Sequence, residues 1–210
     1  AGIPKKTSRA TLSLEDSHTI AILRNSKKIT AQADGVFYFP GCGSERLFSQ
    51  IALATLALLH ELDTQTVLPP GYLCCGYPQR SNGDMKKARQ ISTDNRVLFH
   101  RVANSLSYLD IKTVVVSCGT CLDQIKDYQF DKIFPGSRIM DIHEYLMEKG
   151  MAVKNDSAVQ YLYHDPCHSP MKLYDPIDVT EKLLGRPTLL SERCCGEAGS
   201  FGVALPHIAT

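Results

Sequence analysis

Two Cys-Cys-Gly motifs carry the most reactive chemistry of this sequence. The first is Cys74-Cys75-Gly76 and the second is Cys194-Cys195-Gly196. Thiolate sulfur is both a nucleophile and a soft metal ligand, and clustered cysteines in a chain with a good apolar core indicate metal or redox chemistry. Two adjacent cysteines before a glycine are unusual once in a chain, so the second copy suggests that the unit was duplicated.

All eight cysteines belong to two sets around these motifs. The first set has five members, which are Cys42, Cys74, Cys75, Cys118 and Cys121. The second set has three members, which are Cys167, Cys194 and Cys195. Each set begins with one cysteine ahead of its Cys-Cys-Gly motif, but only the first continues to a Cys-x-x-Cys pair. The second set is therefore a partial copy.

The first set predicts an iron–sulfur site. A structural zinc ion takes four ligands in a tetrahedron, so five converging cysteines exceed its needs, whereas iron–sulfur clusters are held by thiolates. Two other interpretations stay open: Cys42 is an ordinary buried cysteine while the other four bind zinc, or some of the pairs are oxidised. A disulfide between Cys74 and Cys75 would need a strained backbone and ranks low.

The second set allows several interpretations. Its three thiolates, together with either histidine beside Cys167, would complete a tetrahedral zinc site. Alternatively, a further Cys-x-x-Cys pair is missing and the cluster site is incomplete, or these positions are structural relics of the duplication. The candidate metal ligands of this set are His164, Cys167, His168, Cys194 and Cys195.

Composition and charge limit the class of protein. With 210 residues, of which 43% are hydrophobic, the chain can build a packed core. Its 23 basic and 22 acidic residues are nearly balanced, so we expect no nucleic-acid partner. The longest apolar run, residues 51–59, predicts no transmembrane segment, and no secretory signal is present. Clustered thiols favour a reducing compartment, so we expect a cytoplasmic location, with membrane contact only through a partner.

Strand and helix patterns alternate along the chain. Short β-branched and aromatic runs predict strands at residues 36–39, 66–68, 113–116, 159–163 and 188–190. Longer mixed segments predict helices at residues 47–62, 85–109, 122–128 and 142–148. This alternation is typical of α/β proteins with parallel sheets. We expect two related Rossmann-like lobes of this kind, the second of them short or truncated.

Three segments divide the chain in this interpretation. Residues 1–34 are an N-terminal arm or linker, residues 35–155 the first, cluster-binding lobe, and residues 156–210 a second, incomplete lobe. In a parallel sheet every strand-to-helix connection lies at the carboxyl edge, so the cysteines of the first set can converge in one crevice there. Helix amino termini would point into the same crevice and lower the pKa of its thiols.

The motif pattern resembles the cysteine-rich CCG domain found in the B-type subunit of heterodisulfide reductase and in the iron–sulfur subunits of glycolate, lactate and glycerol-3-phosphate oxidoreductases. The resemblance covers the chain from about Gly35 to the end. The sequence segments 164–168 and 193–202 are most similar to the carboxyl-terminal part of large flavin-linked oxidoreductases in that group. The resemblance implies a 4Fe–4S cluster, with the noncubane form as one option, held by Cys42, Cys74, Cys75, Cys118 and Cys121.

The resemblance also implies a function. We expect an electron-transfer domain of a larger flavin-linked oxidoreductase; disulfide reduction and a zinc-stabilised assembly module are the alternatives. Its partners would be flavin-binding and ferredoxin-like domains or subunits of the same enzyme, with quinone or a disulfide as acceptor. The sequence has no Gly-x-Gly-x-x-Gly loop and no ferredoxin cysteine run, so FAD belongs on another domain or subunit. Because the initiator methionine is missing, we expect the chain to be a piece of a longer protein.

Overall fold

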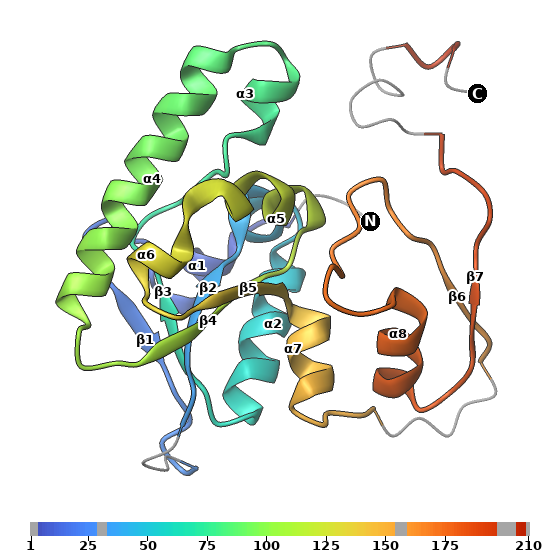
Figure 1. Ribbon diagram of the computed structural model, residues 1–210, viewed down its shortest axis with the longest axis horizontal. Helices are drawn as coiled ribbons and strands as arrows, with labels where there is room; N and C mark the ends of the chain where they lie inside the picture. Colours follow the sequence, from blue (N-terminus) through green and yellow to red (C-terminus); the bar gives the residue numbers. More distant parts are fainter. Residues whose placement is uncertain (1–3, 29–32, 154–158, 197–204, 209–210) are drawn as a thin grey trace.

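The computed structural model describes residues 4–28, 33–153, 159–196 and 205–208 of the chain. Most of these residues build a five-stranded sheet with helices on both faces, and a two-stranded parallel sheet lies beside it (Figure 1). Most strand pairs are parallel, and strands alternate with helices, which confirms the predicted α/β class with two parallel sheets. The boundaries of the arm and the two lobes stay a prediction.

The order of strands in the large sheet determines where a ligand can bind. In spatial order the strands are β1 (Ala21–Leu23), β3 (Gln65–Leu68), β2 (Gly35–Phe39), β4 (Ile111–Val116) and β5 (Arg138–Asp141). All neighbouring pairs are parallel except β1 with β3. From β2 the chain goes outward to β3 and then crosses back to β4 on the other side of β2. Such a reversal leaves a crevice at the carboxyl ends of the two central strands.

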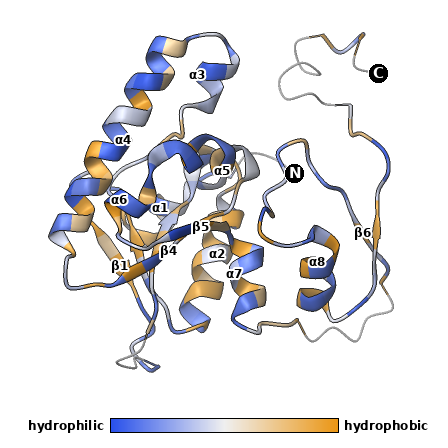
Figure 2. Cartoon of the chain, viewed as in Figure 1, coloured by the Kyte–Doolittle hydropathy of each residue, from blue (hydrophilic) through white to orange (hydrophobic). Residues whose placement is uncertain are grey.

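The large sheet is covered on both faces, and every residue of β2 is buried. Phe37 and Phe39 pack under α4, α5 and α6, whereas Val36 and Tyr38 pack under α2 and α7. Figure 2 shows polar and apolar residues mixed around α4, as expected for a helix with only one side on the core. The bounds of these helices are α2 (Ser49–Glu61), α4 (Met85–Ser105), α5 (Gly119–Ile125), α6 (Phe130–Ile133) and α7 (Ile142–Glu148).

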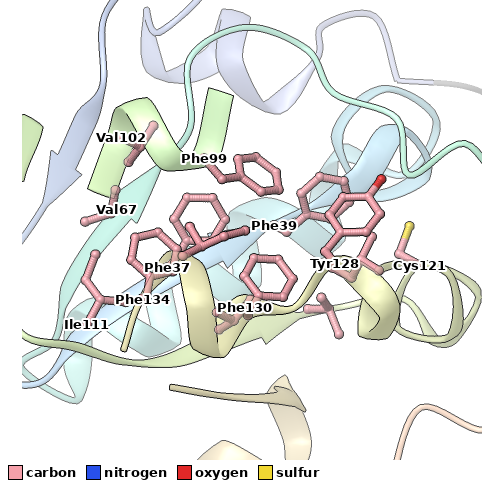
Figure 3. Packing of buried hydrophobic residues seen from close by; sticks show 14 of the residues in the cluster. Phe37, Phe39, Val67, Phe99, Val102, Ile111, Cys121, Tyr128, Phe130 and Phe134 are labelled. Carbon is pink, nitrogen blue, oxygen red and sulfur yellow. The ribbon is translucent and has the colours of Figure 1, made fainter. Parts of the chain in front are cut away.

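Aromatic side chains fill the face under α4, α5 and α6. Phe37 meets Phe99 edge to face, with ring centroids 4.9 Å apart, and Phe99 stacks on Phe130 with centroids 5.8 Å apart. Figure 3 shows this cluster, with Tyr128 and the sulfur of Cys121 at one end. Buried aromatic pairs of this geometry add about 0.5–1.5 kcal/mol each beyond their area burial. The rigid core therefore extends directly to one of the candidate cysteines.

The small sheet pairs β6 (Tyr161–Tyr163) with β7 (Thr188–Leu190) in parallel, as the sequence predicts. The helix between them, α8 (Pro176–Leu184), buries Val179 and Leu183 in the same apolar cluster as α7. Leu162 and Leu189 remain 66% and 54% exposed. Among the helices that the structure describes, none combines the length and apolarity that crossing a membrane requires.

Several short elements are absent from the sequence-based assignment. They are α1 (Ser8–Leu12), β1, α3 (Tyr77–Ser81), α6, β5 and α8. Strand β5 gives a weak signal because its two apolar residues stand between Arg138 and Asp141, and Asp141 also caps α7. Helix α8 has clear end signals, with Asp175 at its N-cap, proline next and a left-handed Gly185 at its end. Most of these elements are too short for a periodic pattern to reveal them.

The N-terminal segment packs on the large sheet through its described residues. Strand β1 pairs with β3, and Arg9 of α1 forms an ion pair with Glu45 in which both side chains are only 2% exposed. Arg9 also donates to the carbonyl oxygen of Pro69 across 2.8 Å. Burial raises the pKa of Glu45, and the neighbouring Arg9 guanidinium opposes that rise. Glu45 lies in the π-helical turn η1 (Gly43–Leu47), directly after Cys42, so Arg9 anchors this turn.

We expect Arg9→Met to lower the free energy of unfolding by about 3–5 kcal/mol, because it leaves the Glu45 carboxylate buried without a counterion. Urea denaturation measures this loss. Adding Glu45→Leu should recover much of it, since the buried charge is then gone as well. The control Lys28→Ala breaks a solvent-exposed pair with Glu61 and should change little. An Arg9→Met loss no larger than that of Lys28→Ala would contradict the prediction.

Candidate functional site

All five cysteines of the first set lie in connections that leave the carboxyl ends of parallel strands. Cys42 follows β2 by a turn of two residues, and Cys74 and Cys75 lie between β3 and α3. Cys118 comes two residues after β4, and Cys121 is on the first turn of α5. Strands β2 and β4 are the pair between which the strand order reverses. The structure therefore brings this set to the crevice that the fold provides.

The five sulfurs contact one another in series. The Cys42 thiol donates to the Cys74 sulfur across 3.9 Å. Cys75 interacts with Cys74 and with Cys121, and Cys121 with Cys118, closely enough that each thiol shifts the pKa of its neighbour. All eight cysteines of the chain are free, and Cys75 and Cys121 are the two buried ones. The first set thus forms one continuous group of thiols that is open on the side of Cys42, Cys74 and Cys118.

Glycine at position 41 lets the first connection approach the Cys-x-x-Cys pair. Gly41 has a φ of +70°, and a Cβ atom there would lie 2.6 Å from the sulfur of Cys121. Both the backbone conformation and the lack of space exclude a larger residue. The Pro40-Gly41-Cys42 turn therefore passes directly over Cys121.

A short hydroxyl network holds the turns of Cys42 and Cys118 together. The hydroxyl of buried Tyr38 lies 2.7 Å from Oγ of Ser117, and Ser117 donates to Oγ of Ser44 across 3.2 Å. Ser44 follows Cys42 by two residues, and Ser117 precedes Cys118. Burial raises the pKa of Tyr38 to about 12, so its hydroxyl stays neutral and available as a donor.

Asn95 and Tyr128 hold the backbone of the Cys-Cys pair. The side-chain amide of Asn95, on α4, donates to the carbonyl oxygen of Cys74 across 2.8 Å and to the Tyr128 hydroxyl across 3.1 Å. The Tyr128 hydroxyl in turn donates to the carbonyl oxygen of Cys75 across 3.1 Å. Sequence reasoning missed both residues. The available signal is weak: one polar residue on the buried side of an amphipathic helix.

The hydrogen bonds divide the thiols into acceptors and donors. Hydrogen bonds from Cys42 and then Cys75 lower the pKa of Cys74 to about 2, and a hydrogen bond from Cys121 lowers that of Cys118 to about 6. Donation to Cys74 and burial raise the pKa of Cys42. Donation to Cys118 and Cys75, with burial, raises the pKa of Cys121.

The Cys75 thiol is both an acceptor and a donor. A hydrogen bond from Cys121 lowers the pKa of its thiol, but its own hydrogen bond to Cys74 and its burial outweigh this and raise that pKa to about 12. Backbone N–H groups add to the stabilisation of the sulfurs: Gly76 donates to Cys74 across 3.4 Å, and the N–H of Tyr77 helps to lower the pKa of Cys75. Two sulfurs of the set, Cys74 and Cys118, are therefore ready as thiolates at neutral pH.

The structure does not bring the second set together. Cys167, Cys194 and Cys195 are exposed, while His164 lines an apolar cavity of about 520 Å³ beside α7 and α8. His168 contacts residues of the first site instead. Within the described residues, no group of three or more His, Cys, Asp or Glu side chains is arranged to hold a metal ion. Residues 197–202, in the segment that follows Cys194 and Cys195, lie outside the described residues. A zinc site in the second set stays a prediction.

Comparison with protein families gives the class of this site. Residues 36–126 match the family model CCG, which is described as a cysteine-rich domain. The matched segment contains all five cysteines of the first set and confirms the resemblance inferred from the motifs. It ends before the second set begins.

Curated relatives match over a larger share of the chain. Over 180 residues the chain is 27% identical to a subunit of the fumarate reductase (CoM/CoB) of Methanothermobacter marburgensis, covering 82% of this chain and 35% of that protein. It is 22% identical over 196 residues to lactate utilization protein A of an Exiguobacterium species, covering 83% and 76%. It is also 22% identical over 191 residues to the "Probable glycolate oxidase iron-sulfur subunit" of Bacillus subtilis, covering 80% and 40%. No solved structure matches the chain significantly. The chain thus spans well under half the length of two of these three relatives.

In metal-free protein we expect alkylation of Cys118 by iodoacetamide to rise with pH through a midpoint near 6, because the thiolate is the reacting form. Cys121→Ala removes the donor that lowers this pKa, so the midpoint should move to higher pH. Peptide mass spectrometry after timed labelling measures the rate at each pH. An unchanged midpoint in Cys121→Ala would show that Cys118 does not depend on this hydrogen bond.

Asn95→Ala should lower the free energy of unfolding by about 1–3 kcal/mol, since it leaves the partly buried carbonyl of Cys74 without this donor. Chemical denaturation checks the loss. The adjacent Asp94→Ala serves as the control, because Asp94 accepts a hydrogen bond from Gln90 on the exposed side of the same helix. Equal losses in the two variants would argue against a role of Asn95 in holding the Cys-Cys backbone.

Proposed function

We propose that this chain is an electron-transfer module that binds an iron–sulfur cluster through the first cysteine set. One observation carries the proposal: five thiols from three strand-to-helix connections form a continuous series at the carboxyl edge of the sheet. A structural zinc ion needs four ligands, whereas thiolates are the usual ligands of iron–sulfur clusters. The proposed ligands are Cys42, Cys74, Cys75, Cys118 and Cys121.

The donor set fits such a group chemically. Metal ligands must be deprotonated, and the lowered pKa values of Cys74 and Cys118 supply two thiolates in advance. The other three thiols now hydrogen-bond to their neighbours, so binding would release their protons and spread the sulfurs around the cluster.

The surroundings of the set suit electron transfer. When bound, an iron–sulfur cluster accepts and releases single electrons. The aromatic core behind Cys75 and Cys121 excludes water from one side and holds their connections rigidly. Cys42, Cys74 and Cys118 are only half-buried, so the opposite side is open to a partner. Rigid ligands would keep the reorganisation energy of electron transfer small. A partner docked on the open side would keep the distance between the cluster and the partner's redox group short.

The names of the relatives support the same proposal. One is an iron–sulfur subunit, and another is a reductase subunit. By analogy, the partners of this chain are flavin-binding and ferredoxin-like domains or subunits of one oxidoreductase, with FAD held outside this chain. Quinone or a disulfide is the proposed acceptor.

The number of thiols bears on the cluster type. A cubane 4Fe–4S cluster uses four cysteines, so five converging thiols are one more than it needs. We therefore favour a noncubane 4Fe–4S cluster that uses all five. A second candidate function, reduction of a disulfide, follows if the cluster is instead a cubane that leaves one cysteine free. That thiolate would attack the substrate disulfide and release one thiol, and two electrons delivered through the cluster by the partner domains, with two protons from solvent, would then release the second thiol and restore the cysteine.

Anaerobic reconstitution with iron and sulfide tests the proposal. We expect about four iron and four sulfide per chain, a brown protein, and loss of both in Cys74→Ser. Cys194→Ser, in the second set, should retain them, because its side chain is exposed and accepts its hydrogen bond from the backbone N–H of Gly196. Zinc without sulfide, unchanged by iron treatment, would contradict electron transfer and favour a zinc-stabilised assembly module.

A further inference from the structure

His168 belongs to the second cysteine set by sequence, yet its side chain contacts two residues on the connections that carry the first set, Tyr77 and Asp123. Its Nε2 is 3.0 Å from the hydroxyl oxygen of Tyr77, and its Nδ1 is 2.6 Å from Oδ2 of Asp123. The rings of His168 and Tyr77 meet edge to face, with centroids 5.0 Å apart. Both ring nitrogens thus have partners on helices of the first site, because Tyr77 begins α3 and Asp123 is on α5.

The backbone of His168 also packs against the turn between Cys118 and Cys121. A Cβ atom on Gly119 would lie 1.9 Å from the carbonyl oxygen of His168 and 3.1 Å from the nitrogen of Pro170. No side chain fits at such a distance, so the glycine between Cys118 and Cys121 is needed for this approach. We call residues 167–170 the strap, because they cross over this turn.

The contacts of His168 are close in sequence to cysteines of the first set. Tyr77 comes two residues after Cys75 and directly after Gly76, whose backbone N–H donates to the Cys74 sulfur across 3.4 Å. Asp123 comes two residues after Cys121. Hydrogen bonds to ligand sulfurs and the groups that orient the ligands are the means by which a protein tunes a cluster. A residue that fixes Tyr77 therefore also fixes an N–H group that points at a sulfur.

Core packing does not explain the position of His168. Its side chain is 34% exposed, and it borders a hollow of about 530 Å³ that is also lined by Arg80 and Lys126. The Asp123 carboxylate has two further cationic neighbours, Lys126 at 3.7 Å and Lys172 at 3.6 Å, and so does not need His168 as a counterion. The two directed contacts of the ring are its distinctive feature.

We propose that His168 is a positioning residue of the first cysteine site. Through Tyr77 and Asp123 it holds α3 and α5 in place, so the strap limits access to Cys121 and sets the reduction potential of the cluster. The part on potential rests on the proposed function, whereas the part on access does not. The second segment then acts on the first site even if it binds no metal of its own.

The experiment compares the full chain with His168→Ala, His168→Gln and Tyr77→Phe. In metal-free protein, alkylation of buried Cys121 should be about tenfold faster in His168→Ala, the effect of losing one hydrogen bond to a charged group. Tyr77→Phe should give a smaller increase, since it removes only a hydroxyl, and His168→Gln should restore part of the protection. After reconstitution, a redox titration should show a shifted midpoint potential in His168→Ala.

Ser169→Ala is the matched control, because Ser169 is on the same strap and its side-chain hydrogen bonds, to the carbonyl of Met171 and with Tyr163, stay outside the first set. It should leave both the alkylation rate and the potential unchanged. Equal behaviour of His168→Ala and Ser169→Ala overturns the inference. Faster alkylation without a shift in the midpoint potential overturns the proposal that His168 sets the reduction potential. Only the proposal that His168 limits access to Cys121 then stands. Failure of the wild-type chain to take up iron counts against the proposed function, while the alkylation rates still decide the question of access.

Discussion

The meeting of five thiols at one edge of the sheet is the constraint that the other features of this site serve. Sulfurs far apart in the sequence meet only because β2, β3 and β4 are parallel and release their connections at one edge. The meeting also needs a glycine where the Cys42 turn crosses Cys121, a hydroxyl network beneath Ser44 and Ser117, and a buried amide behind Cys74. The aromatic core under α4, α5 and α6 supplies the rigid base for all of these contacts.

Sequence patterns predict the central strands of the parallel sheet well, because runs of apolar, β-branched and aromatic residues are strong local signals. The runs at 36–39, 66–68 and 113–116 are buried, apolar and β-branched or aromatic, and they form β2, β3 and β4. Once these strands are parallel, the position of the first cysteine set follows from topology alone. The α/β class and the convergence of the first set were therefore within reach of the sequence.

Other features depend on contacts between residues that give no local sign of them. Arg9 has the sequence context of a surface residue but lies buried against Glu45, and Asn95 is one polar residue in a long helix. His168 stands in a motif typical of a ligand, so its neighbours predicted a metal site rather than contacts with Tyr77 and Asp123. Only the path of the strap across Gly119 brings His168 to these contacts, and that path is a tertiary property.

Strand β1 has a consequence for the outer rim of the sheet. Without it, β3 would be an edge strand with unpaired N–H and C=O groups beside the apolar residues Val67 and Leu68. Open, apolar edges of this kind invite pairing with other chains and aggregation. Because β1 runs antiparallel along β3, the residues ahead of Gly35 cover the backbone N–H and C=O groups of β3 and protect this edge from pairing with other chains. A protein shortened to begin at Gly35 would keep its cysteines but lose β1, and its exposed β3 edge would then favour self-association.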